Sequence, residues 1–258
     1  MAIWIDSPAW PAHGRLWAHV ISDTSLEELH EFAERAGIPA RSFEGDHYDI
    51  PGERHTDVVV AGATVTTGRD LARRLRDSGL RFRKRKGERP LGRHRNGLAA
   101  VRGPHVLDVI ASSLEPPPTA GAAAVIVTDG DQMVLVRNRS RPGWAPPGGK
   151  RVEGETVRQT AAREIAEETG LVLDPLALRP VGYERITIPA GQQVAPWDAG
   201  DNHIAVFTAL VPGRAPVAPV ADDVLQARWV GVAEARQACG DQPWWVLVEH
   251  SLGSRQAR

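Results

Sequence analysis

Residues 149–171 read GKRVEGETVRQTAAREIAEETGL, and this stretch decides how the second half of the chain folds. Its composition predicts a helix over about 155–169. Within that helix Glu164, Glu167 and Glu168 are spaced i, i+3 and i+4, so their carboxylates share one edge. Three like charges on one edge repel each other. A hard divalent cation would relieve that repulsion, and Mg²⁺ prefers carboxylate and water oxygens.

By itself, a Glu-rich helix most often presents a solvated acidic face, so the residues around the glutamates must be considered. Ala161 and Ile165 lie four residues apart on the other side and are expected to pack on a sheet. Gly170 follows at the position where helices commonly end. The preceding residues 144–149 read Trp-Ala-Pro-Pro-Gly-Gly, a loop whose two glycines let the backbone approach a phosphate or a metal closely.

From its first glycine this stretch resembles the Nudix box, the signature of the Nudix hydrolases. The pattern Gly-x5-Glu-x7-Arg-Glu-Ile-Ala-Glu-Glu-Thr-Gly-Leu agrees at every defined position: Gly149, Glu155, Arg163, Glu164, Ile165, Glu167, Glu168, Gly170 and Leu171. The resemblance covers roughly residues 120–250, and its specificity is concentrated in 144–171. It implies a Nudix α/β/α sandwich with a mixed sheet. It also implies Mg²⁺-dependent hydrolysis, with Mn²⁺ as a substitute, of a pyrophosphate bond in a nucleoside diphosphate linked to another group, as in ADP-ribose-like compounds or (d)NTPs.

The resemblance assigns roles to particular residues. The expected metal ligands are Glu164, Glu167, Glu168 and the main-chain carbonyl of Gly148. The expected catalytic groups are the same three glutamates with Arg163, and Glu167 is the first choice of general base. Gly149, Glu155 and Gly170 are expected to be structural, with Glu155 pairing to Arg163.

Residues outside the box carry less information about the substrate. Candidate substrate-binding side chains are Lys150, Arg151, Tyr183, Trp197 and His203, and Asp201, Asp222 and Asp223 are downstream alternatives for the general base. Each also fits an ordinary place in a strand, a loop or the solvated surface. The loop 189–202 is long for a domain of this size, and such loops are often functional.

The remaining elements of the second half follow from local patterns. Two apolar runs, 122–128 and 133–137, are joined by Asp129-Gly130-Asp131, which predicts a β-hairpin. Further strands are expected at 181–188, 204–210 and 227–230. Helices are expected near 233–238 and 244–252, so the domain runs over 119–258.

The first 80 residues predict a small α/β domain. The expected strands are 1–6 and 58–61, and the expected helices are 25–36 and 67–80. The segment resembles an uncharacterised bacterial and phage domain of unknown function, which implies no activity. Its polar residues suit a metal or acid–base site, or else a set of structural histidines: Asp6, His13, His19, His47 and Asp49.

Charge and composition divide the chain and narrow its environment. Residues 1–80 hold 8 Lys+Arg against 13 Asp+Glu, whereas 81–119 hold 9 against 3. The segment 81–118, with Pro116-Pro117-Pro118 at its end, is therefore expected to be a basic, proline-rich linker, with one or two helical turns at 106–114. A single cysteine, no apolar run long enough for a bilayer and no leader at the start favour a cytoplasmic protein.

Two alternatives to a small-molecule hydrolase follow from these features. One is a non-catalytic sensor that binds a nucleotide through a Nudix fold, although members of that kind tend to lose box carboxylates and none is missing here. The other is a hydrolase of RNA 5′ ends that docks nucleic acid through the first domain and the basic segment. Many Nudix enzymes are dimers, so a homodimer is an open expectation.

Overall fold

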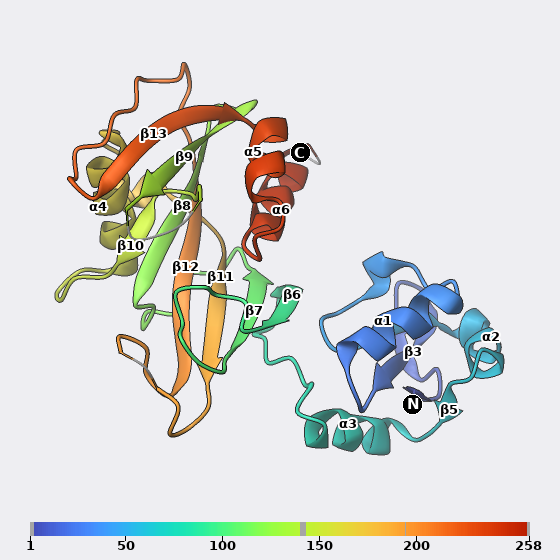
Figure 1. Cartoon of the computed structure of the whole chain (residues 1–258). Coiled ribbons are helices and arrows are strands. Elements are labelled where there is room, and N and C mark those ends of the chain that lie inside the picture. Colours follow the sequence, from blue (N-terminus) through green and yellow to red (C-terminus); the bar gives the residue numbers. More distant parts are fainter. Residues whose placement is uncertain (1–2, 140–142, 194, 257–258) are drawn as a thin grey trace. The chain divides into compact units, whose positions relative to one another are not determined.

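The computed structural model describes residues 3–139, 143–193 and 195–256, and the chain divides into two compact units, Met1–Arg85 and Lys86–Arg258 (Figure 1). Residues 1 and 2 of the first predicted strand lie outside the described residues, as does Val194 of the long loop. No helix among the described residues is both long and apolar enough to cross a membrane.

The first unit is a small sheet with helices. Strand β3 (Arg15–Ser22) is central and pairs with three other strands, all antiparallel. These are β1 (Ile3–Ile5), β2 (Trp10–Ala12) and β4 (Tyr48–Pro51). A short fifth strand, β5 (Thr64–Val65), runs parallel to β1. The helices are α1 (Leu26–Arg35), α2 (His55–Val60) and α3 (Gly68–Asp77), with short 3₁₀ turns at Ala40–Ser42 and Gly52–Arg54.

Helix α1 forms where the sequence predicted it. The Ser25 side chain accepts a hydrogen bond from the backbone N–H of Glu28, which caps the first turn. Leu29, Phe32 and Ala33 are buried in the core of this unit. The amphipathic spacing therefore corresponds to the buried face of the helix.

The predicted strand at 58–61 is wrong, because these residues lie in and just after helix α2. Three consecutive valines favour a strand by local propensity. A strand would place Val58 and Val60 on the same face, but Val58 is fully buried and Val60 is 82% exposed. A short helix buries Val58 and leaves Val60 in solvent, as observed.

The second unit is built on a mixed sheet whose strand order is β13-β9-β8-β12-β11-β7-β6, with β10 added to β8. Strands β8 and β12 are parallel and the other pairs are antiparallel. The strands are β6 (Arg89–Arg95), β7 (Val106–Ala111), β8 (Ala122–Thr128), β9 (Gln132–Asn138), β10 (Gly148–Lys150), β11 (Arg179–Ile188), β12 (Gly200–Leu210) and β13 (Val224–Gly231).

Helices cover both faces of this sheet (Figure 1). Helix α4 (Val157–Thr169) packs on one face, where Ala161 and Ile165 meet a cluster that includes Phe207. Helices α5 (Val232–Cys239) and α6 (Trp245–Gln256) pack on the other, and a 3₁₀ turn at Pro175–Ala177 precedes β11. The expected α/β/α sandwich with a mixed sheet, preceded by a small N-terminal domain, is confirmed.

The predicted linker at 81–118 is wrong for most of its length. Residues up to Arg85 belong to the first unit, where the backbone N–H of Phe82 donates to Asp46 at 2.5 Å. Residues 89–95 and 106–111 form β6 and β7, and β7 pairs with β11. The helical turns expected at 106–114 are likewise wrong, because residues 106–111 form strand β7. This strand lies between β6 and β11, and side chains on both of its faces are buried, so it shows a continuous apolar run.

Candidate functional site

Helix α4 places the box glutamates, and its ends are fixed by local chemistry. Thr156 and Gln159 form a reciprocal capping box at the N-terminus. Gly170 ends the helix in the left-handed conformation, with φ 74°. Between these ends Glu164 and Glu168 are buried on the side of the helix that faces β10, whereas the Glu167 side chain is 47% exposed.

Glu168 is held by two hydrogen-bond donors. The side-chain amide of Asn138 donates to one carboxylate oxygen at 2.6 Å, and the backbone N–H of Gly148 donates to the other at 2.8 Å. Asn138 ends strand β9 and Gly148 begins β10. The two donors therefore hold the carboxylate in place between the ends of two strands and the helix.

The two glycines of the loop are required by crowding. A Cβ atom on Gly148 would stand 2.4 Å from the carbonyl oxygen of Ala123, and one on Gly149 would stand 2.4 Å from a carboxylate oxygen of Glu164. A methyl group at 148 would collide with backbone, and one at 149 would displace the Glu164 carboxylate. The missing side chain at 149 leaves the room that the Glu164 carboxylate occupies.

Arg163 joins the parts of the site. Its guanidinium donates to Glu155 at 2.7 Å, to Glu164 at 2.9 Å and to Glu167 at 2.8 Å, and also to the carbonyl of Lys150 at 2.9 Å. The hydrogen bond from Arg163 is the main reason that the pKa of Glu155 falls to about 2. This network agrees with the predicted structural pairing of Glu155 and Arg163, and it orients two of the three candidate metal ligands.

The donor set of this site fits a hard divalent cation. Burial raises the pKa of Glu164, with Arg163 opposing that shift, so the ionised carboxylate is short of compensating positive charge. The groups that face it are carboxylate oxygens of the same helix edge, together with the loop backbone at 148–149. Such oxygen ligands are the kind that Mg²⁺ prefers.

The predicted substrate-binding residues differ in their burial and in their contacts. Tyr183 is buried in β11, and its hydroxyl donates to Glu88 at 3.0 Å. His203 lies edge-on to Tyr183 on the neighbouring strand, with ring centroids 5.6 Å apart. Trp197 is half-buried against one of the two hydrophobic clusters of the second unit, and Arg151 donates to the carbonyl of Pro118 at 2.7 Å. Arg151 and Tyr183 thus have structural partners.

Lys150 and the downstream aspartates are exposed. The backbone carbonyl of Lys150 accepts from Arg163, as described above. Asp201 accepts a hydrogen bond from Thr187 at 2.8 Å, and the carbonyls of Asp222 and Asp223 accept from Arg139. None of these three contacts is with a box residue, and Glu167 remains the first choice of general base.

Sequence reasoning missed two features of the second unit. Asn138 had no signal beyond its place directly after a predicted strand, and its side-chain amide oxygen is buried without a hydrogen-bond partner among the described residues. The second is a buried ion network in which Arg93 and Arg185 donate to Asp108 at 2.6 Å and 2.5 Å. Asp108 was overlooked because its segment was interpreted as a linker.

In the first unit the structure brings together four of the five predicted polar residues. His19, His47 and Asp49 have ligand-type atoms within 4.8 Å of one another, and Asp6 contacts His19. His13 lies at the tip of the β2–β3 hairpin with φ 51° and is not part of this group. Burial would lower the pKa of His47, but Asp46 and Asp49 raise it to about 9.

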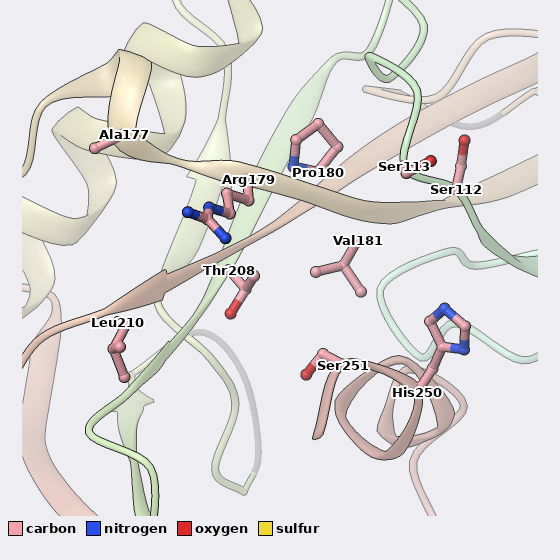
Figure 2. Close-up of a pocket in the computed structure, with 10 residues that line it drawn as sticks. All are labelled: Ser112, Ser113, Ala177, Arg179, Pro180, Val181, Thr208, Leu210, His250 and Ser251. Carbon is pink, nitrogen blue, oxygen red and sulfur yellow. The ribbon is translucent and has the colours of Figure 1, made fainter. Parts of the chain in front are cut away.

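A cavity of about 520 Å³ lies away from the box glutamates (Figure 2). His250 and Ser251 of α6 line it together with β11 and β12 residues that include Arg179 and Thr208. Helix α6 covers the face of the sheet opposite α4. The cavity is therefore separate from the site formed by the box.

Comparison with known proteins agrees with this geometry. Residues 118–246, half of the chain, match the profile of the family described as NUDIX domain, and residues 3–78 match a family described as "Protein of unknown function (DUF4031)". The chain therefore belongs to the Nudix family. The family with which its first unit agrees has no described activity.

Curated relatives match short stretches. A Bacillus subtilis protein named "Putative 8-oxo-dGTP diphosphatase" is 40% identical over 52 residues, which is 20% of this chain and 35% of that protein. A Mycobacterium tuberculosis protein, "Putative 8-oxo-dGTP diphosphatase 2", is 50% identical over 50 residues, 17% of this chain and 36% of that protein. The chain thus spans about a third of the length of these relatives.

Solved structures give more extended but weaker likenesses. A Caenorhabditis elegans Ap4A hydrolase is 18% identical over 53% of this chain and 98% of that chain, with a TM-score of 0.41. The NUDIX domain of Shewanella oneidensis NrtR, in complex with ADP ribose, is 19% identical over 55% and 90%, with a TM-score of 0.38. Similarity at this level does not bear on the substrate.

Proposed function

We propose that the second unit is a Mg²⁺-dependent pyrophosphohydrolase of nucleotides. The observation that carries this proposal is the arrangement of the complete box: Glu164 and Glu168 lie buried beside the Gly148–Gly149 loop, and Arg163 links Glu155, Glu164 and Glu167. Glu164, Glu167, Glu168 and the carbonyl of Gly148 would hold the metal. Mn²⁺, with similar oxygen preference, would substitute for it.

The bound metal would neutralise phosphate oxygens and lower the pKa of a coordinated water. Glu167 is the most accessible of the three glutamates and is proposed to accept the proton of the attacking water. The water oxygen bonds to phosphorus while the bridging P–O bond breaks. Arg163 keeps Glu164 and Glu167 in position, and the Asn138 amide and the Gly148 N–H keep Glu168 in position.

The substrate class is proposed from the relatives' names together with the chemistry. Two curated relatives are named for 8-oxo-dGTP, so oxidised and normal (d)NTPs stand first, followed by ADP-ribose and other diphosphate-linked nucleosides. A non-catalytic sensor is disfavoured because every box carboxylate is present and held by specific partners. A cytoplasmic location is part of the proposal, and it is supported by the single cysteine of the chain, which cannot form an internal disulfide.

The test is release of phosphate, pyrophosphate or nucleoside monophosphate from a substrate panel, with and without Mg²⁺. The panel holds 8-oxo-dGTP, the normal (d)NTPs, ADP-ribose, NAD(H), sugar nucleotides, dinucleoside polyphosphates and a 5′-triphosphate RNA. A Mg²⁺-dependent substrate with kcat/KM ten- to a hundredfold above the others would support the proposal and identify the substrate class.

Glu168→Gln is the variant that tests the site. It keeps the side-chain shape but removes the ionised group, so kcat should fall by about 10³-fold or more, since several kcal/mol of charge stabilisation are lost. Glu234→Gln is the matched control, because Glu234 is exposed on α5 and forms a surface ion pair with Arg228 at 3.1 Å. Full activity in folded Glu168→Gln would refute the proposed metal site.

A further inference from the structure

The first unit contains a second cluster of metal-ligand side chains, unrelated to the box. His19 lies on β3 and Asp49 lies directly opposite it on β4, where the two residues are register partners. His47 directly precedes β4, and its side chain meets those of His19 and Asp49. The His47 Nε2 atom is 3.3 Å from an Asp49 carboxylate oxygen, and the His19 Nε2 atom is 3.8 Å from it.

These spacings suit a shared cation. Ligand atoms about 2.0–2.2 Å from a tetrahedral ion stand about 3.4 Å from one another. The two observed distances lie on either side of that value, and all three ligand atoms are within 4.8 Å of one another. The rings of His19 and His47 meet edge-on, with centroids 5.2 Å apart, so they do not stack on each other.

A second, independent feature is the support behind each imidazole. The Nδ1 atom of His19 is 3.1 Å from a carboxylate oxygen of Asp6, and the Nδ1 atom of His47 is 2.5 Å from one of Asp46. Both aspartates are only 2% exposed. A carboxylate on the rear nitrogen fixes the tautomer and the orientation of a metal-bound histidine, leaving Nε2 for the metal. Both His19 and His47 have a carboxylate on Nδ1, and their Nε2 atoms lie close to the same Asp49 carboxylate oxygen.

The supporting aspartates are themselves fixed. The other oxygen of Asp6 accepts the backbone N–H of His19 at 2.6 Å, and the indole N–H of Trp10 donates to the carboxylate at 3.1 Å. Asp46 accepts the backbone N–H of Phe82 at 2.5 Å. These contacts tie the cluster to the segment after β1, to β2 and β3, and to the end of the unit. Positions on three separate segments thus converge to orient two Nε2 atoms.

We propose that His19, His47 and Asp49 bind one divalent first-row transition-metal ion, with Asp6 and Asp46 as the groups that orient the two histidines. Two imidazoles and one carboxylate select ions such as Zn²⁺, Fe²⁺, Mn²⁺ or Co²⁺ over Mg²⁺, which favours oxygen ligands alone. The three ligand side chains remain 17–38% exposed, so three protein ligands leave positions for water or an exogenous ligand. The proposal does not depend on the activity of the second unit.

The test uses the chain of residues 1–258, freed of metal with a chelator. It is then titrated with Co²⁺ in excess Mg²⁺, which competes for the oxygen ligands of the box. The expected result is one Co²⁺ per chain, with visible absorption typical of nitrogen ligation, displaced by Zn²⁺. Glu168→Gln should show the same absorption, because the box is not the site of uptake. Wild-type protein that takes up no Co²⁺ or Zn²⁺ at micromolar concentration would overturn the proposal, whatever the variants do.

Variants then assign the ligands. His47→Gln should remove the absorption, and Asp46→Asn should weaken binding by about 10- to 100-fold, the effect usual for a group behind a ligating histidine. His13→Gln is the matched control, since this histidine is outside the cluster. Circular dichroism in chelator shows whether each variant is folded. Unchanged Co²⁺ binding by folded His47→Gln would show that the cluster is a structural ion network and not a metal site.

Discussion

At the scale of single residues, Gly149 shows how closely the loop and the catalytic helix approach each other. A methyl group there would lie 2.4 Å from the Glu164 carboxylate. Gly149→Ala should therefore displace a proposed metal ligand and lower kcat/KM by about 10²-fold, since displacements near 1 Å have costs of this size. Gly121→Ala is the matched control, because a Cβ atom at Gly121 meets no atom within 4 Å. Equal steady-state kinetics in the two variants would contradict this account of the loop.

Glu184 provides a pH-dependent contribution to stability. This side chain of β11 is buried, one of its oxygens has no hydrogen-bond partner among the described residues, and burial raises its pKa to about 7. The folded state therefore holds a proton that the unfolded chain loses near its ordinary pKa of 4.5. The stability from this group is complete below about pH 4.5 and is lost as pH rises through 7.

Glu184→Gln should remove this dependence. The free energy of unfolding of the variant, minus that of the wild type, should increase between about pH 4.5 and pH 8 by on the order of 3 kcal/mol. Urea unfolding at several pH values measures this difference directly, because the other titrating groups are common to both proteins. A difference that stays constant across that range would mean that Glu184 is ionised in the folded protein.

At the scale of elements, α4 depends on its caps as well as on its packing. The Thr156 hydroxyl accepts the Gln159 N–H, and the Gln159 side chain accepts the Thr156 N–H. Thr156→Ala should lower the free energy of unfolding by about 1 kcal/mol, while Thr156→Ser, which keeps the hydroxyl, should be nearly neutral. Urea unfolding compares the two. Identical midpoints would indicate that the packing of α4 alone fixes its first turn.

Helix α4 was predictable from the sequence because its signals are local. The four-residue spacing of Ala161 and Ile165 and the terminal Gly170 lie within one short segment, and the box motif adds the expected roles of its side chains. The hairpin of β8 and β9 was predictable for the same reason, since Asp129-Gly130-Asp131 joins two apolar runs. The box-derived metal site and its general base remain predictions.

Other elements depend on contacts distant in sequence, and these were missed. Strand β6 is basic and contains Pro90 and Gly92, with a register shift between them, so its composition resembled that of a linker. Only its pairing with β7, and that of β7 with β11, makes it a strand. In the first unit, the sequence indicated the polar residues, but their convergence required the register that sets His19 opposite Asp49.

At the scale of the whole molecule, the boundary between the units determines which fragments can fold. Along the chain, the first unit ends at Arg85 and the second begins at Lys86, so β6 and β7 belong to the second unit. A fragment of residues 86–258 keeps the full sheet. A fragment of residues 119–258 corresponds to the domain predicted from sequence, but it lacks two strands. The two fragments therefore compare the structural boundary with the sequence-based one.

The shorter fragment loses more than two strands. Removing β7 takes away the buried side chains of Leu107 and Val109 and exposes the edge of β11. It also removes Asp108, whose carboxylate pairs with the Arg185 guanidinium, a side chain only 6% exposed. Leaving one member of a buried ion pair without its partner typically costs about 3–5 kcal/mol, which is comparable with the whole stability of many domains.

Residues 86–258 should therefore be folded, with cooperative thermal unfolding and any hydrolase activity of the second unit retained. Residues 119–258 should be aggregated or unfold at a markedly lower temperature. Circular dichroism, size-exclusion chromatography and the substrate panel distinguish these outcomes. In the longer fragment, Asp108→Asn should produce part of the same loss, because it removes the carboxylate charge while keeping both strands. If residues 119–258 were as stable as residues 86–258, then β6 and β7 would be accessory to the sheet, and the proline segment at 116–118 would be the true domain boundary.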